Sequence, residues 1–283
     1  MRCWASADCM PVFADSIPHN ERMTEKSKAL SITAFATLLL VAFMMGANHV
    51  AARFAFNHGV DVITAVSFRS AVTALVVGLI LWQQKVQIQI ESNHKKYMLI
   101  IGGLIAVQSV CLYSSVARLP VALALLAFNT YPLSTAFWAR VLYKHQAEKA
   151  VLWSMPILLA GLALALDVLG AASGLGAAEH WSQIGAGVAF ALAASATFGL
   201  ALVYTQHETT GLDGRVRTFS SMSIVGILAV AAAMSQGGFH LPQAPAGWWG
   251  LGMLSFLYGT AFTILFTVLP KLGVVGNSAI MNV

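Results

Sequence analysis

Long apolar stretches alternate with short polar segments along this chain of 283 residues. Eight of the stretches approach or exceed the roughly 20 residues that an α-helix needs to cross a bilayer. A ninth begins at Val274 and runs to Val283, the last residue of the sequence. Each stretch is expected to be a helix, because a helix satisfies its own backbone hydrogen bonds in lipid. The eight stretches cover residues 29–50, 62–82, 97–117, 121–141, 151–168, 184–205, 218–234 and 248–269.

Composition supports the same interpretation. Hydrophobic residues make up 58% of the chain and charged residues 10%, whereas charged residues account for about 25% of an ordinary soluble domain. The net charge of +5 does not indicate a nucleic-acid partner, since the charges lie between the apolar stretches rather than on one basic face. Pattern and composition together predict an all-α integral membrane protein with eight complete spans and a partial ninth, whose partner is the lipid bilayer.

The Lys and Arg residues predict how the spans are oriented. If the N-terminus lies inside the cell, the inner segments carry nearly all of the cations, and only Arg53 and Arg118 fall in outer segments. Cytoplasmic loops of membrane proteins carry such an excess of Lys and Arg. We therefore expect a multi-pass protein of the cell membrane. Residues 1–28 would form a disordered cytoplasmic tail, and the Gly- and Ala-rich segment 170–180 an external linker.

An internal repeat indicates a duplicated architecture. Residues 112–121 are echoed at residues 265–274, an offset of 153 residues. The same offset places Arg118 on Lys271, Leu119 on Leu272, Asn129 on Asn282 and Gly46 on Gly199. The first copy has an odd number of spans, so the second copy enters the membrane from the opposite side, as in the inverted repeats of many secondary transporters. We expect two inverted five-helix repeats of a ten-helix parent, at residues 29–169 and, incomplete, at residues 181–283.

Several short motifs resemble the EamA repeat of the drug/metabolite transporter superfamily. They are Arg69 in the second stretch, Tyr113, Arg118-Leu119-Pro120-Val121, Asn129-Thr130-Tyr131-Pro132 and Leu159-Ala160-Gly161. The resemblance covers residues 29–168 and, more loosely, residues 184–283. It implies a secondary transporter that exports small metabolites, such as amino acids or drug-like compounds, by alternating access between its repeats. The first stretch departs from the family's usual Trp-Gly pair, because it carries Phe43-Met44-Met45-Gly46.

Two other classes of function stay open. The second repeat lacks the x-Pro pair of its fourth span and the whole fifth span, so we expect a C-terminally truncated chain, for which a non-transporting membrane fragment or scaffold is the alternative. A membrane-embedded enzyme is a further alternative, but the sequence shows no Walker motif and no metal-ligand spacing among its three cysteines and eight histidines. We therefore predict no enzyme activity, no cofactor and no metal. A homodimer is left open.

Arg69 is the strongest candidate for a functional residue. It is the one Lys, Arg, Asp or Glu well inside an apolar stretch, where an arginine costs about 2.5–3.5 kcal/mol on insertion scales. One interpretation is a cation that faces a cavity and binds an anionic group of a substrate. The other is an arginine that snorkels to the interface or is structurally paired, for instance with Asp61 or Asp167 near the outer face. His49, at the end of the first stretch, is a second candidate, because a histidine can titrate near neutral pH and carry a proton.

Uncharged polar residues supply the remaining candidates. Gln108, Asn129 and Tyr131 lie within the third and fourth stretches, where such side chains line cavities or form hydrogen bonds between helices. Pro132 is expected to break the fourth helix there, and a broken helix is typical of substrate sites in secondary transporters. Asn282 would be the counterpart of Asn129 in the second repeat. Small residues spaced by four, at positions 191, 195 and 199, indicate close helix packing.

Overall fold

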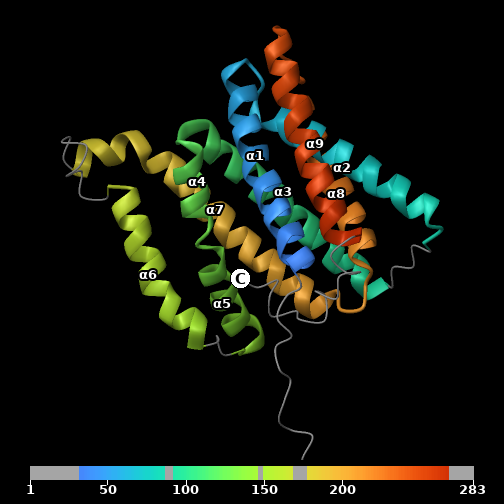
Figure 1. Ribbon diagram of the computed structural model, residues 1–283, viewed down its shortest axis with the longest axis horizontal. Helices are drawn as coiled ribbons and strands as arrows, with labels where there is room; N and C mark the ends of the chain where they lie inside the picture. The colour runs from blue at the N-terminus through green and yellow to red at the C-terminus, as the bar shows by residue number, and fades with distance from the viewer. Residues whose placement is uncertain (1–31, 87–91, 146–148, 168–176, 268–283) are drawn as a thin grey trace, which may run out of the picture.

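The computed structural model describes residues 32–86, 92–145, 149–167 and 177–267 (Figure 1). All regular secondary structure within these ranges is helical, which confirms the all-α prediction. The helices are α1 (Ile32–Asn57), α2 (Val62–Gln83), α3 (Ser92–Arg118), α4 (Val121–Phe128), α5 (Tyr131–Tyr143), α6 (Lys149–Ala165), α7 (Ala177–Glu208), α8 (Gly214–Ser235) and α9 (Pro245–Thr267).

Six segments within the described residues are long and apolar enough to cross a membrane. They are Ile32–Asn57, Val62–Gln83, His94–Arg118, Val121–Tyr143, Ile184–Glu208 and Gly214–Ser235. The fifth and eighth predicted spans correspond to α6 and α9, which are not among these six. The predicted ninth span lies outside the described residues. Six candidate spans within the described residues support a multi-pass membrane protein.

The helix boundaries follow local capping signals. Helix α2 begins at the predicted residue because the Asp61 side chain accepts a hydrogen bond from the backbone N–H of Thr64 at 3.2 Å. Helix α1 continues to Asn57, seven residues beyond the predicted end, and the chain then turns at Gly59 with φ of +89°. Helix α7 starts at Ala177, within the segment 170–180 that is predicted as an external linker.

The fourth predicted span is broken at the expected place. Helix α4 ends at Phe128 and α5 begins at Tyr131, with Pro132 in the first turn of the new helix. Proline fits this position, since the first backbone N–H groups of a helix have no partner within the helix. The break at Asn129 and Thr130 therefore confirms the interpretation of the Asn-x-Tyr-Pro motif as a helix interruption.

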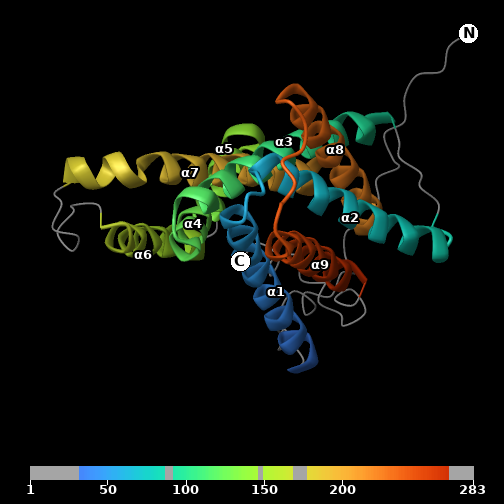
Figure 2. The ribbon, with the colours of Figure 1, turned by 90° about the horizontal axis from the view of Figure 1, so that it is seen from above.

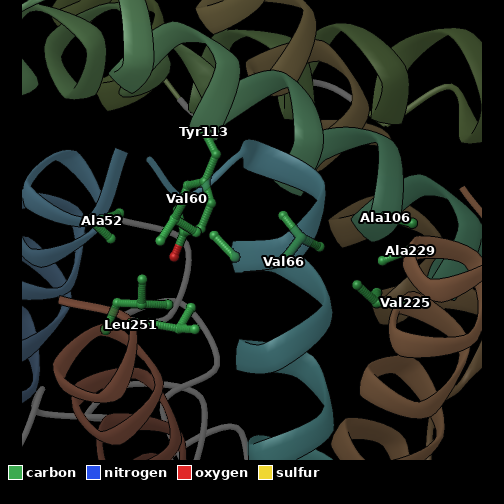
Figure 3. Packing of buried hydrophobic residues seen from close by; sticks show 11 residues of the cluster. Ala52, Val60, Val66, Ala106, Tyr113, Val225, Ala229 and Leu251 are labelled. Atoms are coloured by element: carbon green, nitrogen blue, oxygen red, sulfur yellow. The ribbon is translucent and has the colours of Figure 1, made fainter. Parts of the chain in front are cut away.

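Three pairs of helices make up the centre of the bundle. Helix α1 packs along α9, α2 along α8, and α3 along α7, while α6 lies at the edge and contacts only α4 and α5 among its main neighbours (Figures 1 and 2). The principal core joins α1, α2, α3, α8 and α9 (Figure 3). Many of its residues are alanines, such as Ala52, Ala65 and Ala229. Small side chains let helix backbones approach closely, which is how helices associate within lipid.

Helices α4 and α5 cover one face of α7. Ser195 is 1% exposed, and its hydroxyl lies 2.9 Å from that of Thr130 and 3.1 Å from that of Ser134. The indole N–H of Trp138 donates to the Ala196 carbonyl at 3.1 Å. A Cβ atom added to Gly199 would lie 2.7 Å from the backbone nitrogen of Thr135. The small residues of α7 therefore do support the close packing that their spacing predicts.

Candidate functional site

A cluster of polar side chains lies in the core of the bundle around Arg69. The Arg69 side chain projects from α2 and is 3% exposed. Asn48 on α1 is fully buried, and Ser109 and Tyr113 on α3 are 1% and 0% exposed. Tyr258 reaches the same arginine from α9. The cluster is thus built by four helices, three from the first predicted repeat and one from the second.

Hydrogen bonds connect these side chains in two directions from the guanidinium group. Arg69 Nη1 donates to the Tyr113 hydroxyl at 3.2 Å, and this hydroxyl donates to Asn48 Oδ1 at 3.2 Å. Arg69 Nη2 donates to the Ser109 hydroxyl at 2.8 Å, which donates to Gln108 Oε1 at 3.3 Å. Ser109 and Tyr113 are four residues apart, so they share one face of α3.

Aromatic rings surround the same charge. The guanidinium carbon of Arg69 lies 4.0 Å from the centre of the Tyr258 ring and 4.8 Å from that of Tyr113. The His49 ring packs edge-on against Tyr113, with 5.8 Å between ring centres. Electron-rich ring faces attract a cation, and desolvation strengthens this attraction. The tyrosines therefore offset part of the cost of burying the arginine, but they carry no compensating charge.

No carboxylate pairs with Arg69 among the described residues. The ion pairs in this part of the chain join Arg215 to Asp213 and, at 3.9 Å, His240 to Asp61. Asp61 instead caps α2. Arg69 thus forms no ion pair with Asp61 or Asp167 in the described structure. Arg69 is a buried cation whose charge is not balanced by an acidic neighbour in the described structure.

Several buried nitrogen atoms of the cluster lack hydrogen-bond partners within the described structure. They are Nδ2 of Asn48, Nδ1 of His49 and Nε of Arg69. A buried polar group without a partner costs about 1–3 kcal/mol, and more when it is charged. Three such nitrogens around one arginine are the kind of arrangement that a bound polar group would complete.

The structure brings some of the predicted site residues together and leaves others apart. Arg69 and His49 lie in the cluster. Gln108 is half-buried and accepts a hydrogen bond from Ser109, which itself bonds to Arg69. Asn129 is exposed at the end of α4, and its backbone N–H bonds to Leu125. Tyr131 packs against two phenylalanines, Phe128 at 5.6 Å and Phe198 at 5.2 Å between ring centres. Asn282 lies outside the described residues.

Four members of the cluster were missed as site residues from the sequence: Asn48, Ser109, Tyr113 and Tyr258. The four-residue spacing of Ser109 and Tyr113 in an apolar helix was a usable signal, because it places both on one face. An asparagine within the first apolar stretch was a second signal. Tyr258 could not be found in this way, since only the packing of α9 on α2 brings it to Arg69.

Two surface grooves are present elsewhere on the described bundle. One lies between α1 and α9 and is almost wholly apolar, and the other lies between the end of α2 and Phe219 of α8. The Arg69 cluster lines neither of them. Within the described residues, no three His, Cys, Asp or Glu side chains group in a way that could hold a metal ion.

Comparison with known proteins identifies one domain. Residues 32–166 match the model of the EamA-like transporter family. The matched segment runs from the start of α1 to the end of α6 and contains every member of the cluster except Tyr258. A search of curated proteins finds no match to the chain.

Proposed function

We propose that this chain, whose residues 32–166 match the EamA-like transporter family, is a membrane transporter of the drug/metabolite type and exports small metabolites as a secondary transporter. Amino acids and drug-like compounds are the substrate classes that we favour. The orientation that we propose places the N-terminus in the cytoplasm and rests on the Lys and Arg distribution. No ATP-binding motif is needed for this activity, because an ion or substrate gradient would drive it.

The observation that carries the proposal is the buried, uncompensated Arg69. An ionisable side chain within a membrane bundle is costly, and where it occurs it marks the path of a substrate or ion. Here the guanidinium lies between α2, α3 and α9, and hydrogen bonds extend from it to α1. We propose that Arg69, His49 and Gln108 bind substrate, together with Asn129, Tyr131 and Asn282 only if the bundle rearranges during transport.

Helix pairing supports alternation between two inverted repeats. The 153-residue offset carries α1 onto α7, α2 onto α8 and α3 onto α9. Under this exchange the α1–α9 pair becomes the α7–α3 pair, and the α2–α8 pair becomes itself. The contacts are thus those expected of a two-fold pseudo-symmetric bundle whose axis passes near α2 and α8. In inverted-repeat transporters, one repeat rocks against the other around a central site, and Arg69 on α2 is close to such a centre.

An export assay in reconstituted vesicles that contain an undefined metabolite mixture tests this proposal. The full chain is reconstituted in vesicles loaded with a metabolite extract, and the compounds released are identified by mass spectrometry. We expect specific compounds to leave through the wild-type protein and not through Arg69→Gln, which removes the cation. Lys95→Gln, an exposed residue in the first turn of α3, is the matched control.

The same vesicles test direction. A cleavable tag at the N-terminus reports which vesicle face corresponds to the cytoplasm, and release is expected only from molecules whose N-terminus lies in the lumen. Equal export by Arg69→Gln and wild type, at equal amounts of folded protein, would remove Arg69 from the site. Release of no compound at all would favour the non-transporting scaffold.

A further inference from the structure

We infer that the group bound beside Arg69 is a carboxylate of the transported molecule. That the bound molecule is transported rests on the proposed function. That it carries a carboxylate is inferred from the directions of the hydrogen bonds in the cluster. Of the buried nitrogens of the cluster that lack any partner, two are N–H donors. The chemistry of the missing partner follows from that fact.

The first chain of hydrogen bonds has a fixed direction. A guanidinium group can only donate, so the Tyr113 oxygen accepts from Arg69 at 3.2 Å. The single phenolic proton must then point away from the arginine, and it goes to Asn48 at 3.2 Å. Asn48 must present its carbonyl oxygen to receive that proton. Its amide nitrogen, a donor, is therefore the end left over, and Nδ2 is buried without a partner in the described structure.

The second chain has the same polarity. The Ser109 oxygen accepts from Arg69 at 2.8 Å, and its proton goes to Gln108 Oε1 at 3.3 Å. The hydroxyl oxygens of Tyr113 and Ser109 each accept a hydrogen bond from Arg69, and each hydroxyl then donates its proton to an amide oxygen. Each chain ends in an amide, Asn48 or Gln108, whose carbonyl oxygen already accepts a hydrogen bond.

Two of the three unpartnered nitrogens at the centre are donors. Arg69 Nε and Asn48 Nδ2 are both buried, lack partners and carry hydrogen, and His49 Nδ1 is a third unpartnered nitrogen beside them. A ligand that satisfies them must supply acceptors. A protonated amine or a quaternary ammonium group has no acceptor to offer and would also meet the positive charge of Arg69. Cationic drug-like compounds are therefore poor ligands for this site.

Charge selects among the acceptors. The cluster carries the single positive charge of Arg69, and no acidic side chain in the described structure pairs with it. A carboxylate brings one negative charge and two acceptor oxygens, so it neutralises the site and can bond to two donors at once. A doubly charged phosphate would leave a buried negative charge, which is costly in a membrane bundle.

Geometry indicates which edge of the arginine the carboxylate would use. Both Nη atoms already donate to side chains of α3, and the Tyr113 and Tyr258 rings lie against the guanidinium. Nε is the guanidinium nitrogen that has no protein partner in the described structure. A carboxylate at that edge, bonded also to Asn48 Nδ2, would link α1 to α2 and therefore couple ligand binding to the packing of these helices.

The test uses small anions as probes of the full chain in lipid nanodiscs. Sodium acetate, acetamide, sodium chloride and sodium phosphate are compared at equal ionic strength, and the thermal unfolding midpoint is measured. A ligand that binds only the folded state raises this midpoint in a saturable way. We expect acetate to do so, while acetamide, its neutral counterpart of the same shape, does not. Chloride or phosphate matching acetate would assign the site to an inorganic anion and overturn the inference.

Two substitutions sharpen the test. Arg69→Gln should weaken acetate binding roughly 10- to 100-fold, since it removes a charged hydrogen bond. Asn48→Asp places a carboxylate inside the cluster, where it can pair with Arg69 itself, so the acetate-dependent shift should vanish. Asn57→Asp makes the same change at an exposed position of α1 and should keep the shift. Should Asn48→Asp fail to fold, the comparison of acetate with acetamide on the unmodified chain still decides.

The inference and the proposed function fail in different ways. Export that needs Arg69 but is indifferent to acetate, and that carries compounds lacking a carboxylate, would overturn the inference and leave the transporter standing. Saturable acetate binding that Asn48→Asp abolishes, without export of any compound, would confirm the carboxylate site and overturn transport.

Discussion

Helices α1 and α7 come from equivalent places in the two sequence copies, and each packs along one central partner, but α4 and α5 pack mainly over α7. Val188 and Val203 of α7 are 4% and 0% exposed, and Val188 belongs to a buried cluster with Ala124 and Ala127 of α4. Their counterparts at the 153-residue offset are Phe35 and Val50 of α1, and each is 58% exposed in the described structure. The equivalent helix surface is thus a packing interface on α7 and an exposed apolar face on α1.

The aligned glycines show the difference most sharply. Gly199 allows the backbone of α5 to approach α7, since an added Cβ would lie 2.7 Å from Thr135 N. Gly46 has no atom within 4 Å of the same position and lines the groove of about 660 Å³ between α1 and α9. Glycine is therefore sterically required at position 199 in the second copy, whereas position 46 in the first copy has room for a larger side chain.

The largest expected difference in stability is between the alanine substitutions of these two glycines. Gly199→Ala should destabilise the bundle by about 1–3 kcal/mol, as is usual for overpacking, because the contact is with backbone and cannot rotate away. Gly46→Ala should be neutral or stabilise α1 by roughly 0.5–1 kcal/mol, since alanine restricts the unfolded chain more than glycine. Unfolding in mixed micelles measures both. Equal destabilisation by the two substitutions would mean that the α1 face is also covered.

A smaller effect is expected from the hydroxyl groups of the covered face. Ser195→Ala removes the group that lies between Thr130 and Ser134, and loss of such a buried hydrogen bond costs about 1 kcal/mol. The aligned residue of α1, Ala42, is exposed, so Ala42→Ser should change stability by less than about 0.5 kcal/mol. The same unfolding measurement compares them. A penalty at Ala42 that equals the one at Ser195 would contradict the contrast.

The smallest effect concerns a feature that the two copies share. Asp61 caps α2 and Asp213 caps α8, and hydrogen bonds from the Arg215 side chain hold the pKa of Asp213 below its usual value. The folded-state pKa is lower than the unfolded one, so this stabilisation is complete above about pH 3.9 and is lost as the pH falls through the lowered pKa. Solvent screening limits it to about a few tenths of a kcal/mol.

Asp213→Asn isolates that contribution. The substitution should lower stability slightly near neutral pH and leave it unchanged in strong acid, where the native carboxyl is already protonated. Unfolding midpoints from pH 2 to pH 7 provide the measurement. A difference between variant and native chain that grows in acid would show that the carboxylate does not stabilise the fold.

The sequence predicted those features that depend on nearby residues. The start of α2 at Val62 follows from Asp61, and the break before Tyr131 follows from Pro132. Arg69 was identified because a charged residue inside an apolar stretch is visible in the sequence itself. The end of α1 was misplaced, because the polar residues Asn48 and His49 looked like an interface and are in fact buried in the core.

Pairing between distant segments could not be derived in the same way. Asn129 was favoured because it adjoins a helix break, but the break turns its side chain to the surface while Thr130 is buried against α7. Nothing in the local sequence of α9 indicates that Tyr258 reaches Arg69. Hydropathy locates helices along the chain, and it does not specify which face of each helix meets which neighbour.

The alanine-rich core has a mechanical consequence. Ala52, Ala55, Ala65, Ala106 and Ala229 pack together where α1, α2, α3, α8 and α9 meet. A methyl group has no rotamers to reset and no rotamer entropy to lose, so sliding one helix along another exchanges one methyl contact for a similar one. Such surfaces suit shear, in which packed helices shift by small steps. The core that holds the bundle together therefore also offers little resistance to movement along the helix axes.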